Sequence, residues 1–253
     1  MYFETHAHYD DKKFDEDRND ILNSLKENNI EYVVNVGADM KSSYDSIKLS
    51  QQYDFMYASV GVHPHEARNM KEEDYKILEK WLQYDKVVAL GEIGLDYYYD
   101  FSPREVQREV FKKQLKICEN ITKPVIIHSR DANQEVFDII KESKVRKGVI
   151  HAFSGSLEMA LEYIKLGFFI GVGGVLTFKN ANKLVNVVEN IPLEHILIET
   201  DSPYLSPVPV RGTRNNSQNL KYIVEKISEI KHIEKENVEK ITLETAKMFF
   251  CIK

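Results

Sequence analysis

Two histidines near the start of the 253-residue chain have the spacing of a metal-binding pair. His6 and His8 lie two residues apart within the run 2–8 (YFETHAH). On a β-strand, side chains two residues apart point to the same face, so both imidazoles would lie together. Two neutral ring nitrogens at close range suit one divalent ion. Taken alone, the motif leaves open an ordinary pair of polar side chains.

Further residues of ligand type occur at or near the ends of other apolar runs: Glu92, His128, His151 and Asp201. An acid within a run as apolar as 87–94 would be costly to bury unless it were paired or metal-bound. A single strand-end histidine is more often structural, but the combination favours a metal centre. Four imidazoles and two carboxylates suffice for two divalent ions with open coordination positions if one carboxylate bridges.

These residues need a scaffold that brings distant segments of the chain together. Short apolar runs recur with a mean step of about 28 residues, which is enough for a strand, a helix and two loops. Several runs are apolar almost throughout, as is typical of parallel strands covered on both faces. The runs cover residues 2–8, 31–37, 56–62, 87–94, 123–129, 147–153, 168–174 and 195–201.

The gaps between these runs read as helices, most clearly at 15–28, 103–119, 156–166, 180–190, 217–230 and 236–249. Ser102 and Pro103 predict the N-cap and first residue of the helix over 103–119. The alternation predicts one domain over 1–253, an α/β TIM-type (β/α)8 barrel with its site at the C-terminal ends of the strands. A doubly wound open sheet is the alternative, yet no GxGxxG follows the first run.

Composition limits the functional classes. With 34 Lys and Arg against 40 Asp and Glu, the formal charge of −6 argues against a broad surface that coats nucleic acid, although it leaves room for a local phosphate site. The chain has two cysteines, Cys118 and Cys251, which cannot form a disulfide framework, so we expect a reducing, cytoplasmic compartment. No apolar run approaches the roughly 20 residues of a membrane span, so no membrane partner is expected.

Seven blocks of the sequence match one known family. They are Thr5-His6-Ala7-His8, Gly61-Val62-His63-Pro64-His65, Gly91-Glu92-Ile93-Gly94-Leu95-Asp96-Tyr97, Ser102-Pro103-Arg104, Pro124-Val125-Ile126-Ile127-His128-Ser129-Arg130, His151-Ala152-Phe153-Ser154-Gly155 and Glu199-Thr200-Asp201-Ser202-Pro203-Tyr204-Leu205. With these blocks the chain resembles the TatD-related metal-dependent deoxyribonucleases, a branch of the amidohydrolase superfamily. The resemblance extends from the first predicted strand to beyond the eighth.

The resemblance implies a TIM-type barrel that holds two or three divalent ions and hydrolyses DNA, often from a 3′ end. Mg, Mn and Zn all suit a mixed histidine and carboxylate site. The resemblance implies that one ion is bound by His6, His8, Glu92 and Asp201. It implies that a second ion is bound by Glu92, His128 and His151, with Glu92 bridging the two. We expect Glu92 and Asp201 to be the catalytic residues. Asp201 would orient the attacking water or accept its proton, with a purely ligating role as the alternative.

The resemblance also places His63 and His65 beside the scissile phosphate; loop histidines held rigid by Pro64 are the alternative. Arg130 follows the fifth run and could grip a phosphate oxygen as a bidentate fork. Tyr97 begins a row of three tyrosines, in which one exposed ring could stack on a splayed base.

Two more arginines, Arg211 and Arg214, follow the eighth run and could also hold phosphate, with surface salt bridges as the alternative. Their loop, 211–217, departs from the family pattern by lacking a proline, and Glu4 stands where the family usually has aspartate. These departures leave the substrate preference of the loop and the role of Glu4 open, without touching the ligand set.

The expected partner is therefore DNA, as a single strand or a 3′ end, because a narrow barrel mouth cannot read an intact duplex; no obligate protein partner is inferred. The main alternative is an amidohydrolase-type ester or amide hydrolase, such as a D-aminoacyl-tRNA deacylase, since metal-activated water serves both reactions. A binding module without catalysis is a second alternative, against which the complete ligand set argues.

Overall fold

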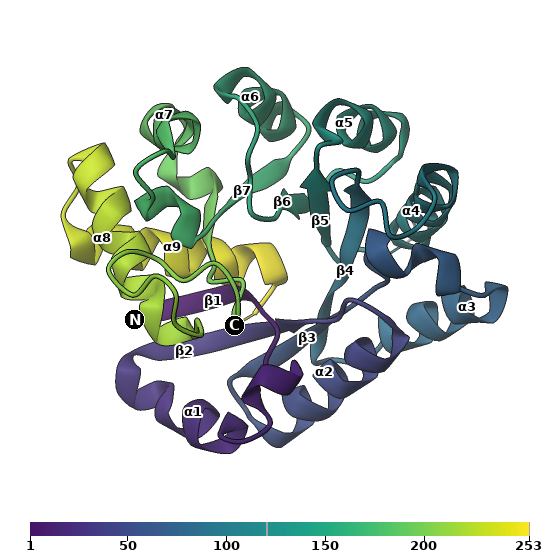
Figure 1. Ribbon diagram of the computed structural model, residues 1–253, viewed down its shortest axis with the longest axis horizontal. Helices are drawn as coiled ribbons and strands as arrows, with labels where there is room; N and C mark the ends of the chain where they lie inside the picture. Colours follow the sequence, from purple (N-terminus) through teal and green to yellow (C-terminus); the bar gives the residue numbers. More distant parts are fainter. Residues whose placement is uncertain (120, 253) are drawn as a thin grey trace.

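Eight apolar segments form parallel strands that pair in sequence order from β1 to β8 in the computed structural model, which describes residues 1–119 and 121–252. Figure 1 shows the strands at the centre of the molecule. The strands are β1 (Tyr2–Ala7), β2 (Ile30–Val36), β3 (Met56–Val60), β4 (Val87–Asp96), β5 (Val125–Arg130), β6 (Gly148–Ile150), β7 (Phe168–Val172) and β8 (Ile196–Ile198). The predicted TIM-type barrel is confirmed.

The barrel is nearly closed, and its last seam lies beside the predicted ligands. β1 and β8 meet beyond the end of β8, where Ala7 and Ser202 form a parallel bridge. The N–H of Asp201 donates to the carbonyl of His6 at 2.9 Å, and that of His8 donates to Ser202 at 2.7 Å. Backbone pairing therefore ties the H-x-H segment directly to the segment that carries Asp201.

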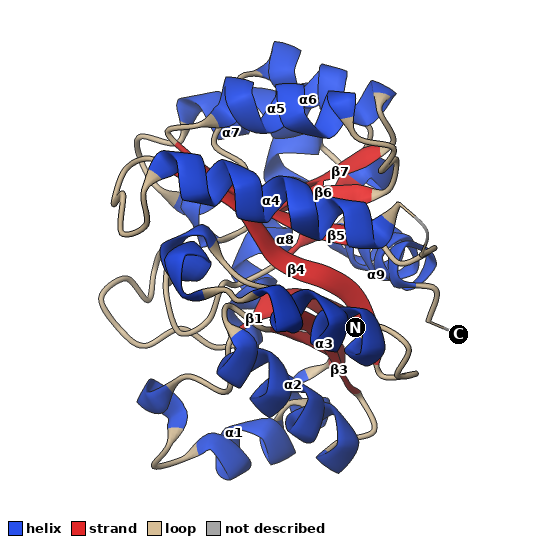
Figure 2. Ribbon diagram, turned by 90° about the vertical axis from the view of Figure 1, so that its right-hand side faces the viewer, coloured by secondary structure: helices blue, strands red, loops and turns tan. Residues whose placement is uncertain are grey.

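Amphipathic helices cover the outside of the sheet, and Figure 2 shows them around the strands. Their apolar residues are buried against the strands while charged residues face outward, the pattern of helices that pack on one face. They are α1 (Arg18–Ser24), α2 (Met40–Gln52), α3 (Glu72–Trp81), α4 (Arg104–Cys118), α5 (Asn133–Glu142), α6 (Leu157–Lys165), α7 (Asn182–Asn190), α8 (Leu220–Lys231) and α9 (Lys235–Phe250). No helix in the described part of the chain is long and apolar enough to cross a membrane.

Helix α9 differs from the others because it covers one end of the barrel. Its buried residues Ala246, Phe249 and Phe250 form one apolar cluster with Phe3 at the start of β1 and Val88 at the start of β4. Both partners lie at the N-terminal ends of their strands, so α9 closes the end opposite the strand termini at which the ligands were expected.

Three local predictions need correction. β4 was expected to end at 94 but continues to Asp96, because Leu95 and Asp96 still pair with β5. β6 stops at Ile150, since the chain turns at Ala152, whose φ is +43°. Ser102 does not cap α4; its hydroxyl donates to the carbonyl of His65 instead, and Pro103 takes the N-cap position.

Candidate metal centre

Glu92 is the centre of the site. It lies in β4, buried, at 4% exposure, and five imidazoles have a ring nitrogen within 4 Å of its carboxylate. The distances are 2.8 Å to His128, 3.4 Å to His6, 3.7 Å to His63, 3.8 Å to His8 and 3.9 Å to His151. These histidines come from four different strands or the loops after them. The barrel thus gathers residues from across the sequence around one acid.

The two histidines of the H-x-H motif, His6 and His8, direct their Nε2 atoms toward the same point. The Nε2 atoms of His6 and His8 lie 3.1 Å apart, and Asp201 Oδ1 lies 3.5 Å from that of His8. His8 Nδ1 is 2.8 Å from the carbonyl oxygen of Val36, which can only accept, so Nδ1 carries the proton and Nε2 is free to ligate. Tetrahedral zinc with nitrogen ligands near 2.05 Å separates them by about 3.3 Å. The pair therefore fits a shared divalent ion.

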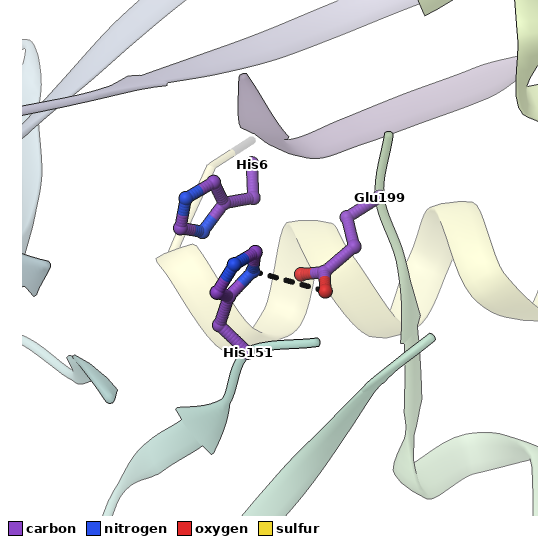
Figure 3. A group of neighbouring side chains, drawn as sticks. All are labelled: His6, His151 and Glu199. Carbon is purple, nitrogen blue, oxygen red and sulfur yellow. Dashed lines mark ion pairs between the residues drawn. The ribbon is translucent and has the colours of Figure 1, made fainter. Parts of the chain in front are cut away.

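His151 adds a second buried imidazole beside His6. Their rings stack with centroids 3.5 Å apart, and Figure 3 shows Glu199 directed at His151, whose Nδ1 lies 3.0 Å from its carboxylate. Glu199 needs the glycine at 171, since a Cβ there would lie 2.8 Å from its Oε2. His6 Nδ1 is buried with no hydrogen-bond partner among the described residues. An ion shared with His8 would bind His6 through Nε2, on the other side of the ring, so Nδ1 stays outside the ligand set of that ion.

Asp96 belongs to the site although the motif reading gave it no role. It is fully buried, and its Oδ2 lies 3.0 Å from Nε2 of both His65 and His128. Asp96 and Glu92 are four residues apart on β4, so both face the same side of the strand. Gly94 between them has φ +149°, and a Cβ there would overlap the carbonyl oxygen of His128. This glycine allows β4 to approach β5 closely enough for both acids to reach His128.

The buried carboxylates of the cluster need positive charge nearby. Burial would raise the pKa of Glu92, but His151, His63 and His6 more than offset this and hold that pKa well below its usual range. Burial lowers the pKa of His8, yet its hydrogen bond to Asp201 raises it to about 9, and the carboxylate of Glu199 brings that of His151 to about 10. Without a cation, protons must neutralise these acids. A divalent ion would replace the protons.

Glu4, which stands where the family usually has aspartate, connects two segments of the chain beside the site. Its carboxylate accepts hydrogen bonds from the Thr200 N–H at 2.8 Å, the Thr200 hydroxyl at 2.6 Å and the His6 N–H at 3.2 Å. Complete burial raises its pKa to about 7. The side chain thus joins β1 to the chain just before Asp201 and does not face the imidazoles.

Three expected substrate-side residues lie beside the cluster. His63 is 8% exposed and its Nδ1 accepts the N–H of His65 at 3.1 Å. It lies deeper than a mouth residue, since its ring centroid is 4.3 Å from that of His128. His65 is bound to Asp96. Arg130, at the end of β5, is exposed, and its guanidinium stacks on Tyr98 at 4.0 Å.

The structure does not bring the other three to the cluster. Arg214 is held by a bidentate pair with Asp17, at 2.8 and 2.5 Å. Arg211 stacks on Phe178 at 4.0 Å and donates to the carbonyl of Ser206 at 3.4 Å. Tyr97 donates its hydroxyl to Glu135 at 2.7 Å, away from the mouth. All three side chains are occupied by the protein itself.

Comparison with known proteins agrees with this geometry. The family model of the TatD related DNases matches residues 3–251. This chain belongs to the TatD-related DNase family. It is 41% identical over its full length, and the full length of the relative, to the uncharacterized metal-dependent hydrolase YabD of Bacillus subtilis. It is 32% identical to the uncharacterized metal-dependent hydrolase YcfH of Escherichia coli K12, over 98% of this chain and 95% of the relative.

A solved TatD homologue confirms the architecture. The crystal structure of YjjV from Escherichia coli K12 superimposes with a TM-score of 0.94 and 28% identity, over 100% of this chain and 98% of that one. The protein is therefore a metal-dependent hydrolase of the TatD family with a TIM-type barrel.

The resemblance implied one ligand set for each of two ions. These sets can be compared with the clusters of metal-ligating side chains that the structure forms. Among the described residues, three groups have ligand atoms within 4.8 Å of one another: His6, His8 and Glu92; His63, Glu92 and His128; and His6, His151 and Glu199. The first matches the expected first ion, with Asp201 at its edge. In the second, His63 stands where the resemblance suggested His151. Glu92 belongs to two groups, which is the geometry a bridging carboxylate needs.

Proposed function

We propose that this protein is a metal-dependent deoxyribonuclease that hydrolyses phosphodiester bonds at the 3′ ends of single-stranded DNA. The observation that carries the proposal is the buried Glu92 carboxylate with five imidazoles within 4 Å. The description of the matching family, TatD related DNase, supports DNA as the substrate. Mg, Mn or Zn would occupy the groups on either side of Glu92.

Phosphodiesters resist hydrolysis because their negative charge repels nucleophiles. Divalent ions at this site would neutralise that charge and bring the pKa of a water near 7. Glu92 and the imidazoles would hold the ions, and Arg130 would add a cation at the rim. Its guanidinium makes no ion pair within residues 1–119 and 121–252, so its donors are available to a phosphate.

Asp201 is the best-placed general base. Its side chain is 18% exposed against 5% for Glu92, so it is the carboxylate that faces the mouth. It would accept the proton as the water oxygen bonds to phosphorus; the P–O ester bond would then break, and the proton would pass from Asp201 to the oxygen that leaves. A single-stranded end is the favoured substrate because a single strand can enter a mouth whose reactive groups are buried, whereas a duplex cannot; the choice of the 3′ end rests on the family resemblance.

The test measures cleavage of single-stranded, 3′-recessed and RNA oligonucleotides by metal-free protein, with Mg, Mn or Zn added back. His128→Ala removes an expected metal ligand whose Nδ1 lies 2.8 Å from the Glu92 carboxylate, and His232→Asn is the matched control. His232 ends α8 far along the chain from the site with φ +54°, a conformation that asparagine tolerates. We expect metal-dependent cleavage of single-stranded DNA, a large loss in His128→Ala and normal activity in His232→Asn.

Cleavage that resists chelation, or full activity in His128→Ala, would overturn the metal mechanism. If no oligonucleotide is cleaved with any metal, while aminoacyl esters or amides are, the protein is an acyl hydrolase such as a D-aminoacyl-tRNA deacylase.

A further inference from the structure

Three large aromatic side chains stand exposed on the loop between β4 and α4. Tyr98 is 59% exposed, Tyr99 47% and Phe101 54%. Apolar side chains that are exposed singly are common, but three within four residues form a patch, and patches mark binding sites. We call Tyr98, Tyr99 and Phe101 the aromatic platform.

The aromatic platform is continuous with the metal centre. Phe101 lies 4.8 Å from the ring of His65, and Tyr99 lies 5.4 Å from it. His65 in turn shares the carboxylate of Asp96 with His128. His65 therefore links the rings of Tyr99 and Phe101 to the hydrogen-bonded cluster.

The backbone of the loop is fixed at both ends. Asp96 Oδ1 accepts the N–H groups of Tyr98 at 3.1 Å and Tyr99 at 2.9 Å. At the other end, the Ser102 hydroxyl donates to the carbonyl of His65 at 2.8 Å. Within the loop, Tyr99 and Phe101 stack with centroids 5.2 Å apart. The rings are thus held in place before any ligand arrives, which reduces the entropy lost on binding.

We propose that the aromatic platform binds substrate by stacking on the nucleobases closest to the scissile bond. The proposal rests on the nuclease function and adds the part of the substrate that is recognised. Every base has a π face, so ring stacking gives affinity for single strands with little sequence preference. It also requires unpaired bases, which explains a preference for single-stranded ends.

Charge at the platform favours a nucleic acid over a protein segment or a second copy of the chain. The guanidinium of Arg130 lies 4.0 Å from the Tyr98 ring centroid and 4.7 Å from that of Tyr99. A cation that could bind a phosphate therefore lies beside the rings offered to the bases. Tyr97 does not contribute, because its side chain is only partly exposed and its hydroxyl donates to Glu135.

The test combines two protein forms with two substrates under single-turnover and steady-state conditions with the metal that supports activity. One single-stranded oligonucleotide carries normal bases, and the other has abasic sites at its four 3′-terminal nucleotides. The proteins are the wild type and the Tyr99→Ala/Phe101→Ala double variant. In the wild type, loss of the bases should raise KM roughly 10-fold or more, with a much smaller change in kcat. In the double variant, the ratio of KM for the abasic oligonucleotide to KM for the normal oligonucleotide should fall to nearly one.

Two further variants separate stacking from a structural effect. Tyr99→Phe keeps the ring and should keep the wild-type ratio. Tyr84→Ala removes a tyrosine of 38% exposure in the turn before β4, at the opposite end of the barrel, and should change nothing. A wild-type ratio near one, or a ratio that survives in the double variant, would overturn the platform and leave the nuclease intact. No cleavage of either oligonucleotide by wild type would overturn the nuclease function itself.

Discussion

The two ends of the barrel are equally buried and chemically opposite. At the C-terminal ends of the strands, Glu92, His6 and His151 are each 5% exposed or less, and all are polar. At the N-terminal ends, Phe249 and Phe250 of α9 are 3% exposed or less, within an apolar cluster. Buried ionisable side chains therefore lie at the C-terminal ends of the strands, and buried apolar side chains lie at the N-terminal ends.

This difference separates function from stability. Burying carboxylates and imidazoles is unfavourable until a cation neutralises them, so the strand ends of the mouth contribute little to the stability of the metal-free protein. Packing α9 into the base removes large aromatic surfaces from water and contributes directly. Substitutions in the mouth should therefore reduce activity more than stability, and substitutions in the base should do the reverse.

The largest expected effect is at Glu92. Glu92→Gln removes the charge shared by two ligand groups while keeping the shape of the side chain. We expect hydrolysis to fall by roughly a thousandfold or more, since electrostatic stabilisation of the reacting groups is lost. Metal content per chain, measured by atomic emission, should fall with it, while circular dichroism stays unchanged. Normal metal content with full activity would show that Glu92 is not a ligand.

The counterpart at the base is Phe249→Ala. Phe249 is fully buried, with ring centroids 4.7 Å from Phe250 and 4.9 Å from Phe169. Truncation should lower the free energy of unfolding by about 3–5 kcal/mol, which urea denaturation measures. The folded fraction should keep its metal content and its kcat. A loss of kcat per folded molecule as large as that of Glu92→Gln would mean that the two ends are coupled.

A smaller effect is expected at Asp96, whose carboxylate holds His128 and His65 together. Asp96→Asn replaces the carboxylate that two imidazoles share by a neutral amide. Metal affinity or activity should therefore fall roughly 10- to 100-fold, as when other groups that hydrogen-bond to metal ligands are substituted. Asp100→Asn is the matched control in the same loop, because within the described part of the chain Asp100 forms an ion pair only with the exposed Arg104, and its φ of +50° suits asparagine. Equal effects of the two substitutions would place Asp96 outside the site.

Residues on strands were predictable from the sequence because strand geometry alone fixes where they go. His6, Glu92 and His128 occupy the ends of parallel strands or the faces directed inward, and these converge in any closed barrel. Asp96 was missed because β4 was expected to end two residues before it. Its own signal was present, since a four-residue spacing from Glu92 keeps both acids on one face.

Residues on loops were less predictable, because their surroundings depend on contacts between distant parts of the chain. Nothing local distinguishes Tyr97 from Tyr98; only the path of the loop places one against α5 and leaves the other exposed. Arg214 meets Asp17 across 197 residues of sequence, a pairing that no spacing reveals. The role of Glu4 likewise depends on Thr200 at the far end of the chain.

The smallest expected effect concerns two of the three arginines that were expected to hold phosphate, Arg130 and Arg214. Arg214 already has a carboxylate partner, whereas Arg130 has none within residues 1–119 and 121–252. Arg130→Gln should raise KM for single-stranded DNA and reduce the slope of log affinity against log salt by about 1, the signature of one lost phosphate contact. Arg214→Gln should leave both quantities within about twofold of wild type, because a partly exposed pair of this kind contributes little. The measurement is a salt titration of binding with metal present and a non-hydrolysable phosphorothioate end. The opposite pattern, with the slope changed only in Arg214→Gln, would mean that DNA displaces Asp17 and that the loop after β8, rather than the rim beside the aromatic platform, receives the phosphate backbone.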